Sequence, residues 1–357
     1  MRRHSFRKFL ASFIITITVC IVIAGSGYAA WQHFVRPPAI QERVEVIRHI
    51  PTERDVNDEP AFIVPDPEDA GLLLGAPPSV VVELMDRKPN FYTFLIYGLD
   101  EGYNTDTIMV GAFDNENGEA FLISIPRDTR VDVTRNHRKI TTSYAAGRLH
   151  GRGHAGGIDQ LKSEVQSLVG FRPDFYVSVD YQAFVMLVDS LGGVEVDVPF
   201  HMRNTHPDAG VHIDIPAGLQ TLSGQQVLNF VRFRNADSGF RAITDYGRIE
   251  NQQLVISTIV NELLHPSTIM RIPEFLRIYQ DYITTDLIFR EKLYFAEQLV
   301  SAGSNFSLYT YTLPIAGTSG APRWYELPYR NGIIELVNRT VNPFEQDITA
   351  DMLRIAS

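Results

Sequence analysis

The sequence predicts an α/β sandwich, in which helices cover both faces of a central mixed sheet, with one transmembrane helix ahead of this domain. Apolar runs typical of strands alternate with helical stretches from Phe91 to about residue 340, which is the pattern of a sheet packed between helices. The composition agrees with it, because 357 residues that are 45% hydrophobic and 21% charged can bury a sizeable core.

The N-terminal segment has the character of a membrane anchor. Residues 1–8 carry four basic side chains and no acidic one, and residues 9–31 carry no charge. A helix of that length spans roughly 35 Å, enough to cross one hydrocarbon layer. Basic residues before the span predict a cytoplasmic N-terminus and an extracytoplasmic domain. A signal peptide cleaved near residues 27–30 is the alternative, but the uncharged run is longer than a typical signal core.

A proline-rich stretch follows the anchor. Residues 36–90 contain nine prolines among scattered charges, and proline at this density disfavours regular structure. We therefore expect residues 32–90 to be an extracytoplasmic linker, of which short apolar pieces such as Val80–Leu84 dock on the domain.

The first half of the domain is predicted to be mainly strand. Turn residues at 114–118 separate two apolar runs, as in a hairpin. The helical spacing of Ile158–Val169 predicts the first long helix. The strands expected here are Phe91–Tyr97, Thr107–Phe113, Ala120–Ile125 and Phe175–Val179.

In the second half, helices predominate. Gly192 and Gly193 would end a helix over Tyr181–Leu191, and Ser223 and Asp245 are the expected N-caps of two later helices. Residues 341–357 show no interpretable pattern and are expected to be a C-terminal tail beyond a domain of residues 91–340. The other expected elements are a strand at 194–198, helices at 224–231, 246–264, 267–280 and 289–302, a strand at 307–313 and a helix at 331–340.

Composition also excludes some functions. The net charge of −10 argues against nucleic acid as a partner. A single cysteine, Cys20, excludes an internal disulfide framework and any metal site built from several cysteines.

Several arginines lie where predicted elements end. Arg127 follows one strand, and Arg232 and Arg234 follow a helix. On the next helix Arg248 and Gln252 are four residues apart and share a face, with Asp245 one turn back. Guanidinium groups bind phosphate oxygens bidentately, so this pattern indicates a phosphate site. Ordinary surface ion pairs, Arg127 with Asp128 and Arg248 with Asp245, are the alternative.

Two carboxylates complete this picture. Asp100 follows one predicted strand and Asp106 precedes the next. Carboxylates beside clustered arginines suit a divalent cation that bridges phosphates.

Taken in order, these segments resemble the LytR-CpsA-Psr family. The resemblance runs from about residue 91 to 265, and weakly on to 340. The matching segments are 94–100 (FLIYGLD), 105–109 (TDTIM), 124–129 (SIPRDT), 191–199 (LGGVEVDVP), 222–228 (LSGQQVL), Arg232 with Arg234, and 245–248 (DYGR).

The resemblance implies an extracytoplasmic phosphotransferase that moves a glycopolymer from a polyprenyl pyrophosphate carrier onto peptidoglycan through a phosphodiester. It implies Mg²⁺ near Asp100 and Asp106. It implies catalytic roles for Asp106, Arg127, Asp245 and Arg248, with Asp245 either orienting an arginine or acting as a base. The pyrophosphate ligands that it implies are Arg127, Lys139, Arg232, Arg234, Arg248 and Gln252.

Some positions depart from the family pattern. Asn104 and Thr105 stand where an arginine is frequent, Asn251 replaces another, and residues 235–244 form a longer segment than usual. These changes bear on substrate detail and leave the main ligands in place.

A basic segment at 135–154 is unusual. A mobile rim that meets an anionic polymer and a plain solvated loop are both open for it. Gly151 and Gly153 argue against the helix that a metal pair of His150 and His154 would need.

Other functions also stay open. A non-catalytic binder of polyprenyl-linked glycans and a polyprenyl pyrophosphate phosphatase both suit the same residues. A transcriptional regulator does not, because no basic helix-turn-helix is visible.

Overall fold

The computed structural model describes residues 35–49, 80–100, 102–206, 211–265, 268, 283–320 and 323–355. The predicted membrane helix, much of the predicted linker and nearly all of the helix expected at 267–280 lie outside these residues. No helix in the described part is both long and apolar enough to span a membrane.

Two compact units make up the described chain. Residues 287–301, together with 35–40, form a small unit that holds most of helix α9 (Phe289–Ala302). Every other element belongs to the larger unit, which carries the site.

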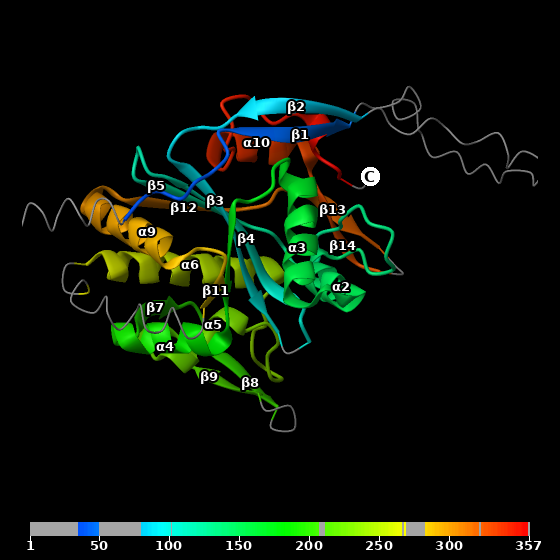
Figure 1. The fold of residues 1–357 in the computed structure, drawn as a ribbon. Coiled ribbons are helices and arrows are strands. Elements are labelled where there is room, and N and C mark those ends of the chain that lie inside the picture. Colours follow the sequence, from blue (N-terminus) through cyan, green and yellow to red (C-terminus); the bar gives the residue numbers. More distant parts are fainter. Residues whose placement is uncertain are drawn as a thin grey trace, which may run out of the picture. The chain divides into compact units, whose positions relative to one another are not determined.

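A six-stranded mixed sheet forms the centre of the larger unit, as predicted (Figure 1). The strand order is β11-β6-β3-β4-β5-β12; β3 pairs in parallel with β6, β5 pairs in parallel with β12, and the other neighbours are antiparallel. The strands are β3 (Phe91–Leu99), β4 (Thr105–Asp114), β5 (Glu119–Ser124), β6 (Phe175–Val179), β11 (Ile283–Thr285) and β12 (Ser307–Thr312).

Alternation along β4 divides its side chains between two layers. Ile108, Val110 and Ala112 enter the core on one face of the sheet, together with helices α3 (Gly153–Val169) and α10 (Arg330–Thr340). Successive strand residues point to opposite faces, so Met109 lies on the other side.

The second face is covered by a separate apolar cluster. It packs α4 (Tyr181–Leu191), α5 (Gly224–Arg232) and α6 (Asp245–Leu264) around buried residues such as Val188, Phe230 and Val255. Two antiparallel ribbons complete this layer. They are β7 (Val194–Val198) with β10 (Gly218–Leu222) and β8 (Met202–His206) with β9 (Val211–Ile215).

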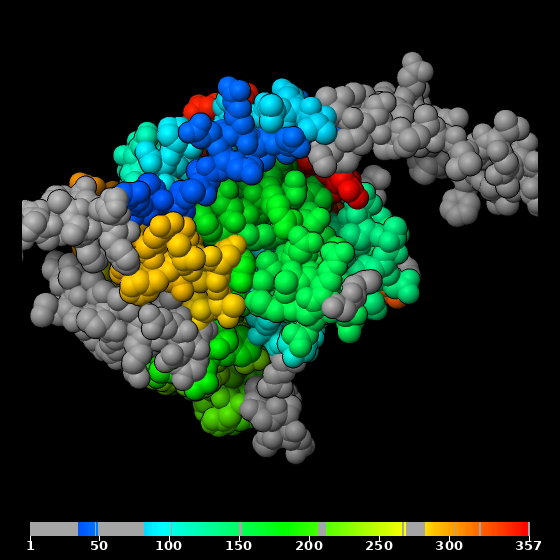
Figure 2. Space-filling model, viewed as in Figure 1, coloured from blue at the N-terminus to red at the C-terminus, as the bar shows by residue number. Residues whose placement is uncertain are grey.

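The predicted linker and tail are both partly wrong. Strands β1 (Arg43–His49) and β2 (Val80–Asp86) pair along seven residues and place Val46 and Met85 in the core. The segment after residue 340 buries Phe344 and Ile348 in the same core, and Figure 2 shows red C-terminal atoms beside the cyan strand β2. The folded domain therefore includes both segments.

The basic segment is folded rather than a free rim. It forms η1 (Ile140–Thr142), α2 (Ser143–Gly147) and the π-helical turn η2 (Arg148–Arg152), which leads into α3. Gly151 lies within η2, but Gly153, with a φ of 56°, breaks the helix between η2 and α3, so no continuous α-helix spans residues 150–154, as expected. Gly156 and Gly157 let α3 approach α2 closely, because a Cβ on Gly157 would lie 2.7 Å from the Tyr144 ring.

Two short strands were not predicted. β13 (Ile315–Ser319) and β14 (Tyr325–Pro328) form an antiparallel hairpin, and β14 also pairs in parallel with the segment after β5 through Thr129 and Glu326. This hairpin therefore lies directly beside the predicted phosphate-binding arginine, Arg127.

Candidate functional site

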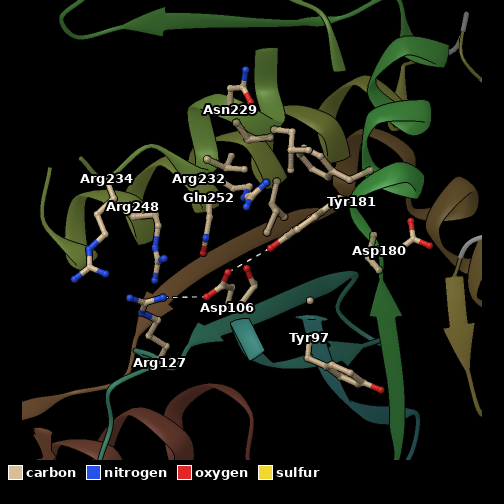
Figure 3. Close-up of a pocket in the computed structure, with 18 of the residues that line it drawn as sticks. Tyr97, Asp106, Arg127, Asp180, Tyr181, Asn229, Arg232, Arg234, Arg248 and Gln252 are labelled. Atoms are coloured by element: carbon tan, nitrogen blue, oxygen red, sulfur yellow. Dashed lines mark hydrogen bonds and ion pairs between the residues drawn. The ribbon is translucent and has the colours of Figure 1, made fainter. Parts of the chain in front are cut away.

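A cavity of about 840 Å³ lies between the central sheet and the helices α4, α5 and α6. Six of the predicted site residues line it: Asp106, Arg127, Arg232, Arg234, Arg248 and Gln252. Figure 3 shows the side chains of Arg127, Arg234 and Arg248 grouped at one end of the cavity.

A β-bulge aims Asp106 into this cavity. In the β3–β4 ladder Gly98 pairs with Thr107 and Leu99 pairs with Thr105, so the register skips Asp106. A bulge redirects the side chain of the extra residue, and both Asp106 and Thr107 line the cavity as a result.

Both oxygens of Asp106 have partners. Oδ1 lies 3.0 Å from the Nη1 atom of Arg127, and Oδ2 accepts a hydrogen bond of 3.3 Å from the Tyr181 hydroxyl. Figure 3 shows Asp106 between these two side chains. Asp106 therefore connects the arginine end of the cavity to helix α4.

Arg127 is held by a tight turn at the end of β5. The backbone N–H and the hydroxyl of Thr129 both donate to the Pro126 carbonyl, at 3.0 and 2.6 Å. The Arg127 carbonyl accepts from the Thr141 N–H at 3.1 Å. These bonds fix the backbone on both sides of the arginine, which limits the entropy lost when its side chain binds a ligand.

Helix α6 places its site residues on one face, as predicted. Arg248, Gln252, Val255 and Ile256 all line the cavity, at the spacing of successive turns. The N-cap, however, is Thr244, whose hydroxyl accepts from the Gly247 N–H at 3.2 Å. Asp245 is the first helical residue rather than the expected cap.

Asp245 orients two of the arginines. Its Oδ1 atom lies 3.5 Å from the Nε atom of Arg234 and 3.5 Å from the Nη2 atom of Arg248. Burial lowers the pKa of Arg248, and the nearby Arg127 guanidinium lowers it further. An anionic ligand would strongly stabilise a buried cation that lies beside another cation.

Tyr181 connects α4 to α5. The Arg232 guanidinium lies over its ring at 4.4 Å from the centroid, and burial raises the pKa of the hydroxyl. Tyr181 was not predicted as a site residue, because a tyrosine at the start of an amphipathic helix is typical of an ordinary core position.

Two arginines of the cavity carry buried donors without a partner. The Nε atoms of Arg127 and Arg248 are buried and have no hydrogen-bond partner in the described structure. Such donors destabilise the free protein unless something accepts from them. Two of them at one end of a cavity suit an anion with several oxygens.

Apolar side chains form much of the remaining wall, which also includes polar residues: Asp180, Asn204, His212, Gln225, Asn229 and Asn235. Val179 of β6 and Phe184 of α4 are part of this wall. The cavity thus combines a cationic end with a largely apolar remainder. The other apolar lining residues are Ile96, Met109, Leu122, Ile213, Leu228, Val231, Val255 and Ile256.

The two predicted metal ligands differ in their surroundings. Asp106 lies in the cavity, whereas Asp100 does not line it and accepts from the backbone and side chain of Asn104, at 2.8 and 3.1 Å. Asp100 is nevertheless close enough to raise the pKa of Tyr181 slightly. No cluster of three acidic, histidine or cysteine side chains suited to a metal occurs in the described residues. Two carboxylates with ligand phosphates suit Mg²⁺, which keeps several waters.

Lys139 is not brought to the cavity. Its Nζ atom forms an ion pair of 3.0 Å with Asp128, and it is absent from the cavity wall. Its assignment as a phosphate ligand stays a prediction.

Glu326, on β14, was missed from the sequence. Burial raises its pKa to about 7, and the neighbouring Asp128 and Asp245 raise it too. Glu326 is the only acidic residue in the segment Trp324–Pro328, and nothing in the sequence indicates that it lies near Asp128 and Asp245 in the folded chain.

Clustered guanidinium groups at one end of a largely apolar cavity, within an α/β/α domain, define a class of protein whose site suits an amphiphilic anion. The LytR_cpsA_psr family model matches residues 77–330. The chain therefore belongs to this family, and the resemblance seen in its motifs is confirmed.

Named relatives agree with this membership. The chain is 27% identical over 223 residues to the polyisoprenyl-teichoic acid–peptidoglycan teichoic acid transferase TagV of Bacillus subtilis, a match that covers 59% of this chain and 54% of TagV. It is 32% identical over 246 residues to the cell wall biosynthesis protein LcpA of Corynebacterium glutamicum, covering 62% and 45%. The chain thus spans about half the length of these relatives.

Solved structures share the fold. The crystal structure of B. subtilis TagV aligns with a TM-score of 0.56 at 23% identity, over 70% of this chain and 95% of TagV. TagT bound to LIIa-WTA aligns with a TM-score of 0.56 at 21% identity, over 72% and 92%.

Proposed function

We propose that this protein is an extracytoplasmic phosphotransferase that moves a glycopolymer from a polyprenyl pyrophosphate carrier onto peptidoglycan through a phosphodiester bond. One observation carries the proposal: unpartnered buried guanidinium donors of Arg127 and Arg248 belong to one end of a cavity whose remaining wall is largely apolar. A lipid pyrophosphate presents the matching sequence of groups, an apolar chain that ends in two phosphates.

The reaction needs charge stabilisation more than covalent help. The acceptor hydroxyl attacks the phosphorus that bears the glycan, the bond from that phosphorus to the bridging oxygen breaks, and polyprenyl phosphate leaves with the electron pair. Arg127, Arg248 and Arg234 would stabilise the charge that develops on the phosphates. Asp245 keeps Arg234 and Arg248 in place for this task through the two ion pairs described above.

Magnesium is part of the proposal. Asp106 and Asp100 would hold it, and bound there it would neutralise phosphate charge. Since Asp106 already binds Arg127 and Tyr181, its carboxylate would link the cation site to the arginines.

The membrane anchor supports the same assignment. A helix over residues 9–31 with the domain outside would keep the cavity close to the membrane that contains the lipid carrier. This location is a proposal that rests on the charge pattern of residues 1–31.

The test uses the full chain in detergent, with a polyprenyl-pyrophosphate-linked sugar, peptidoglycan fragments and Mg²⁺, and follows products by mass spectrometry. We expect a glycan–phosphate–peptidoglycan adduct together with released polyprenyl phosphate. Hydrolysis of the carrier without an adduct would instead indicate a phosphatase. Tight binding without turnover would indicate a non-catalytic glycan binder, and either outcome would overturn the proposal.

A further inference from the structure

One part of the cavity wall is polar without a permanent charge. Its side chains come from β8, β9, α5 and the segment that follows α5, and the transfer proposed above uses none of them. We call this part the polar wall. Its residues are Asn204, His212, Gln225, Asn229 and Asn235.

Asn204 is the most buried residue of the polar wall. It is 8% exposed, and its Oδ1 atom has no hydrogen-bond partner in the described structure. The chain is fixed on both sides of it, because the Thr205 N–H donates to Asp237 Oδ1 at 2.9 Å and the Asp237 N–H donates to the Arg203 carbonyl at 2.9 Å. Asp237 follows Arg234 by three residues, so these bonds hold Asn204 beside the segment that carries a site arginine.

Asn229 connects the polar wall to another arginine of the site. It precedes Arg232 by three residues on α5, and both side chains therefore lie on one face of the helix. Two hydrogen bonds orient its amide. Nδ2 donates to the His212 carbonyl at 3.3 Å, and Oδ1 accepts from the Gln225 Nε2 atom at 3.1 Å. The polar wall is thus an ordered surface that continues from the arginines.

Of the three parts of a polyprenyl-pyrophosphate-linked glycan, only the sugar matches this surface. A side-chain amide both donates and accepts hydrogen bonds, as do a sugar hydroxyl and an acetamido group. Phosphate oxygens at neutral pH only accept, and a polyprenyl chain does neither. A lipid chain against Asn204 would leave a buried polar group unpaired, which is unfavourable. Because the last torsion of an asparagine side chain is broad, the Asn204 amide can turn either of its atoms to a ligand.

We propose that the polar wall is the subsite for the first sugar of the donor, the one joined to the pyrophosphate, and that Asn204 and Asn235 hydrogen-bond this sugar. Asn235 directly follows Arg234 and lines the cavity, so it is placed to meet the group that comes next after the phosphates. The wall offers amides and no permanent cation, which suits an uncharged hydroxyl- or acetamido-bearing sugar. This assignment rests on the proposed function and names the part of the donor that these residues recognise.

The experiment compares two probes by calorimetry with the full chain in detergent: polyprenyl pyrophosphate that carries one N-acetylhexosamine, and the same lipid without the sugar. The wild type should bind the sugar-bearing lipid more tightly. Asn204→Leu, which removes the amide at similar volume, should weaken binding of that lipid about tenfold and change binding of the sugar-free lipid by less than about twofold. Asn235→Ala should act in the same direction. Since Asn235 is exposed, this second variant keeps the test valid if Asn204→Leu fails to fold.

Asn261→Leu is the matched control. Asn261 is an exposed asparagine of α6 that does not line the cavity, and its replacement should change neither affinity. Equal weakening of both lipids in the two test variants, or no weakening of either, would overturn the subsite. A raised KM for peptidoglycan fragments with unchanged lipid affinities would assign the wall to the acceptor sugar and overturn the donor assignment. A wild type that shows the expected binding preference but forms no adduct would support the subsite and overturn the proposed transfer.

Discussion

Asp106 shows how much depends on single residues in this site. Its side chain enters the cavity because the β3–β4 ladder skips it, and once there it meets both Arg127 and Tyr181. Motif resemblance identified Asp106 and Arg127 as site residues. Their mutual contact depends on the bulge, and nothing in the sequence marks it.

Arg127→Ala gives the most direct test at this scale. The Arg127 guanidinium lines the cavity, and the Pro126 turn fixes its backbone. The substitution should therefore weaken ligand binding and leave the stability of the fold unchanged. We expect kcat/KM for transfer to drop at least about 100-fold, as when one preorganised donor to a developing charge is removed. Steady-state kinetics and a thermal melt of the same variant check both parts.

A matched control is Arg43→Ala. Arg43 also forms an arginine–aspartate pair, with Asp86 at 2.8 Å, but its side chain is 68% exposed and far along the chain from the site. An exposed pair is worth less than about 1 kcal/mol, so both activity and melting should stay near wild type. Equal losses in the two variants would show that Arg127 acts only on the fold.

At the scale of elements, the sequence was informative wherever one periodic pattern continued long enough. Helix α6 was expected at 246–264, is observed at Asp245–Leu264, and presents Arg248 and Gln252 on one face as its period requires. The ribbon of β1 and β2 was missed because its two strands are separated by a proline-rich stretch, which reads as linker. β14 was missed because four residues are too few for a pattern.

The basic segment at 135–154 could not be interpreted from sequence for another reason. Its Arg135 pairs inside the fold with an acid from the helix that follows. Glu164 of α3 is buried and accepts from Arg135, whose Nη2 atom lies 2.7 Å from Oε2, as well as from Ser143 and Gln160. A basic tract therefore contains a buried ion pair that ties the loop after β5 to α3.

Glu164→Ala should therefore be strongly destabilising. The substitution leaves the Arg135 guanidinium, whose side chain is only 20% exposed, without its carboxylate. Breaking one partner out of a buried pair costs about 3–5 kcal/mol. Asp159→Ala is the control on the same helix, since Asp159 pairs with Arg172 at 2.6 Å but is 58% exposed, and should cost less than about 1 kcal/mol. Urea unfolding measures the free energy of unfolding of both variants. Similar losses in the two would mean that the Glu164–Arg135 pair does not stabilise the fold.

At the scale of the whole molecule, distant ends of the chain close one core. The buried cluster on the α3 face of the sheet takes residues from the ribbon of β1 and β2, from the sheet itself and from the segment after α10. Arg48 of β1 reaches Asp351 at 3.3 Å, and the Lys88 N–H donates to the Pro343 carbonyl at 2.9 Å. Contacts across such separations leave no local signal in the sequence, which is why the domain extends past both predicted boundaries.

A chain truncated after Thr340 should consequently fail to fold cooperatively. The deletion removes five apolar side chains that are each 5% exposed or less: Val341, Phe344, Ile348, Met352 and Leu353. Burying one such side chain contributes about 1.5–3 kcal/mol, so the sum is comparable to the whole stability of a typical domain, about 5–15 kcal/mol.

Since an unfolded truncation gives no graded measurement, Phe344→Ala supplies one. Phe344 is 2% exposed, and its replacement should lower the free energy of unfolding by about 3–5 kcal/mol in urea titrations. Its exposed neighbour Glu345 is the control, and Glu345→Ala should change stability by no more than about 0.5 kcal/mol. A truncated chain that melts like wild type, or a Phe344→Ala variant no weaker than the control, would mean that the C-terminal segment is an appendage. The core would then have to be stable without this segment, although its side chains are buried in one cluster with those of α3 and β2.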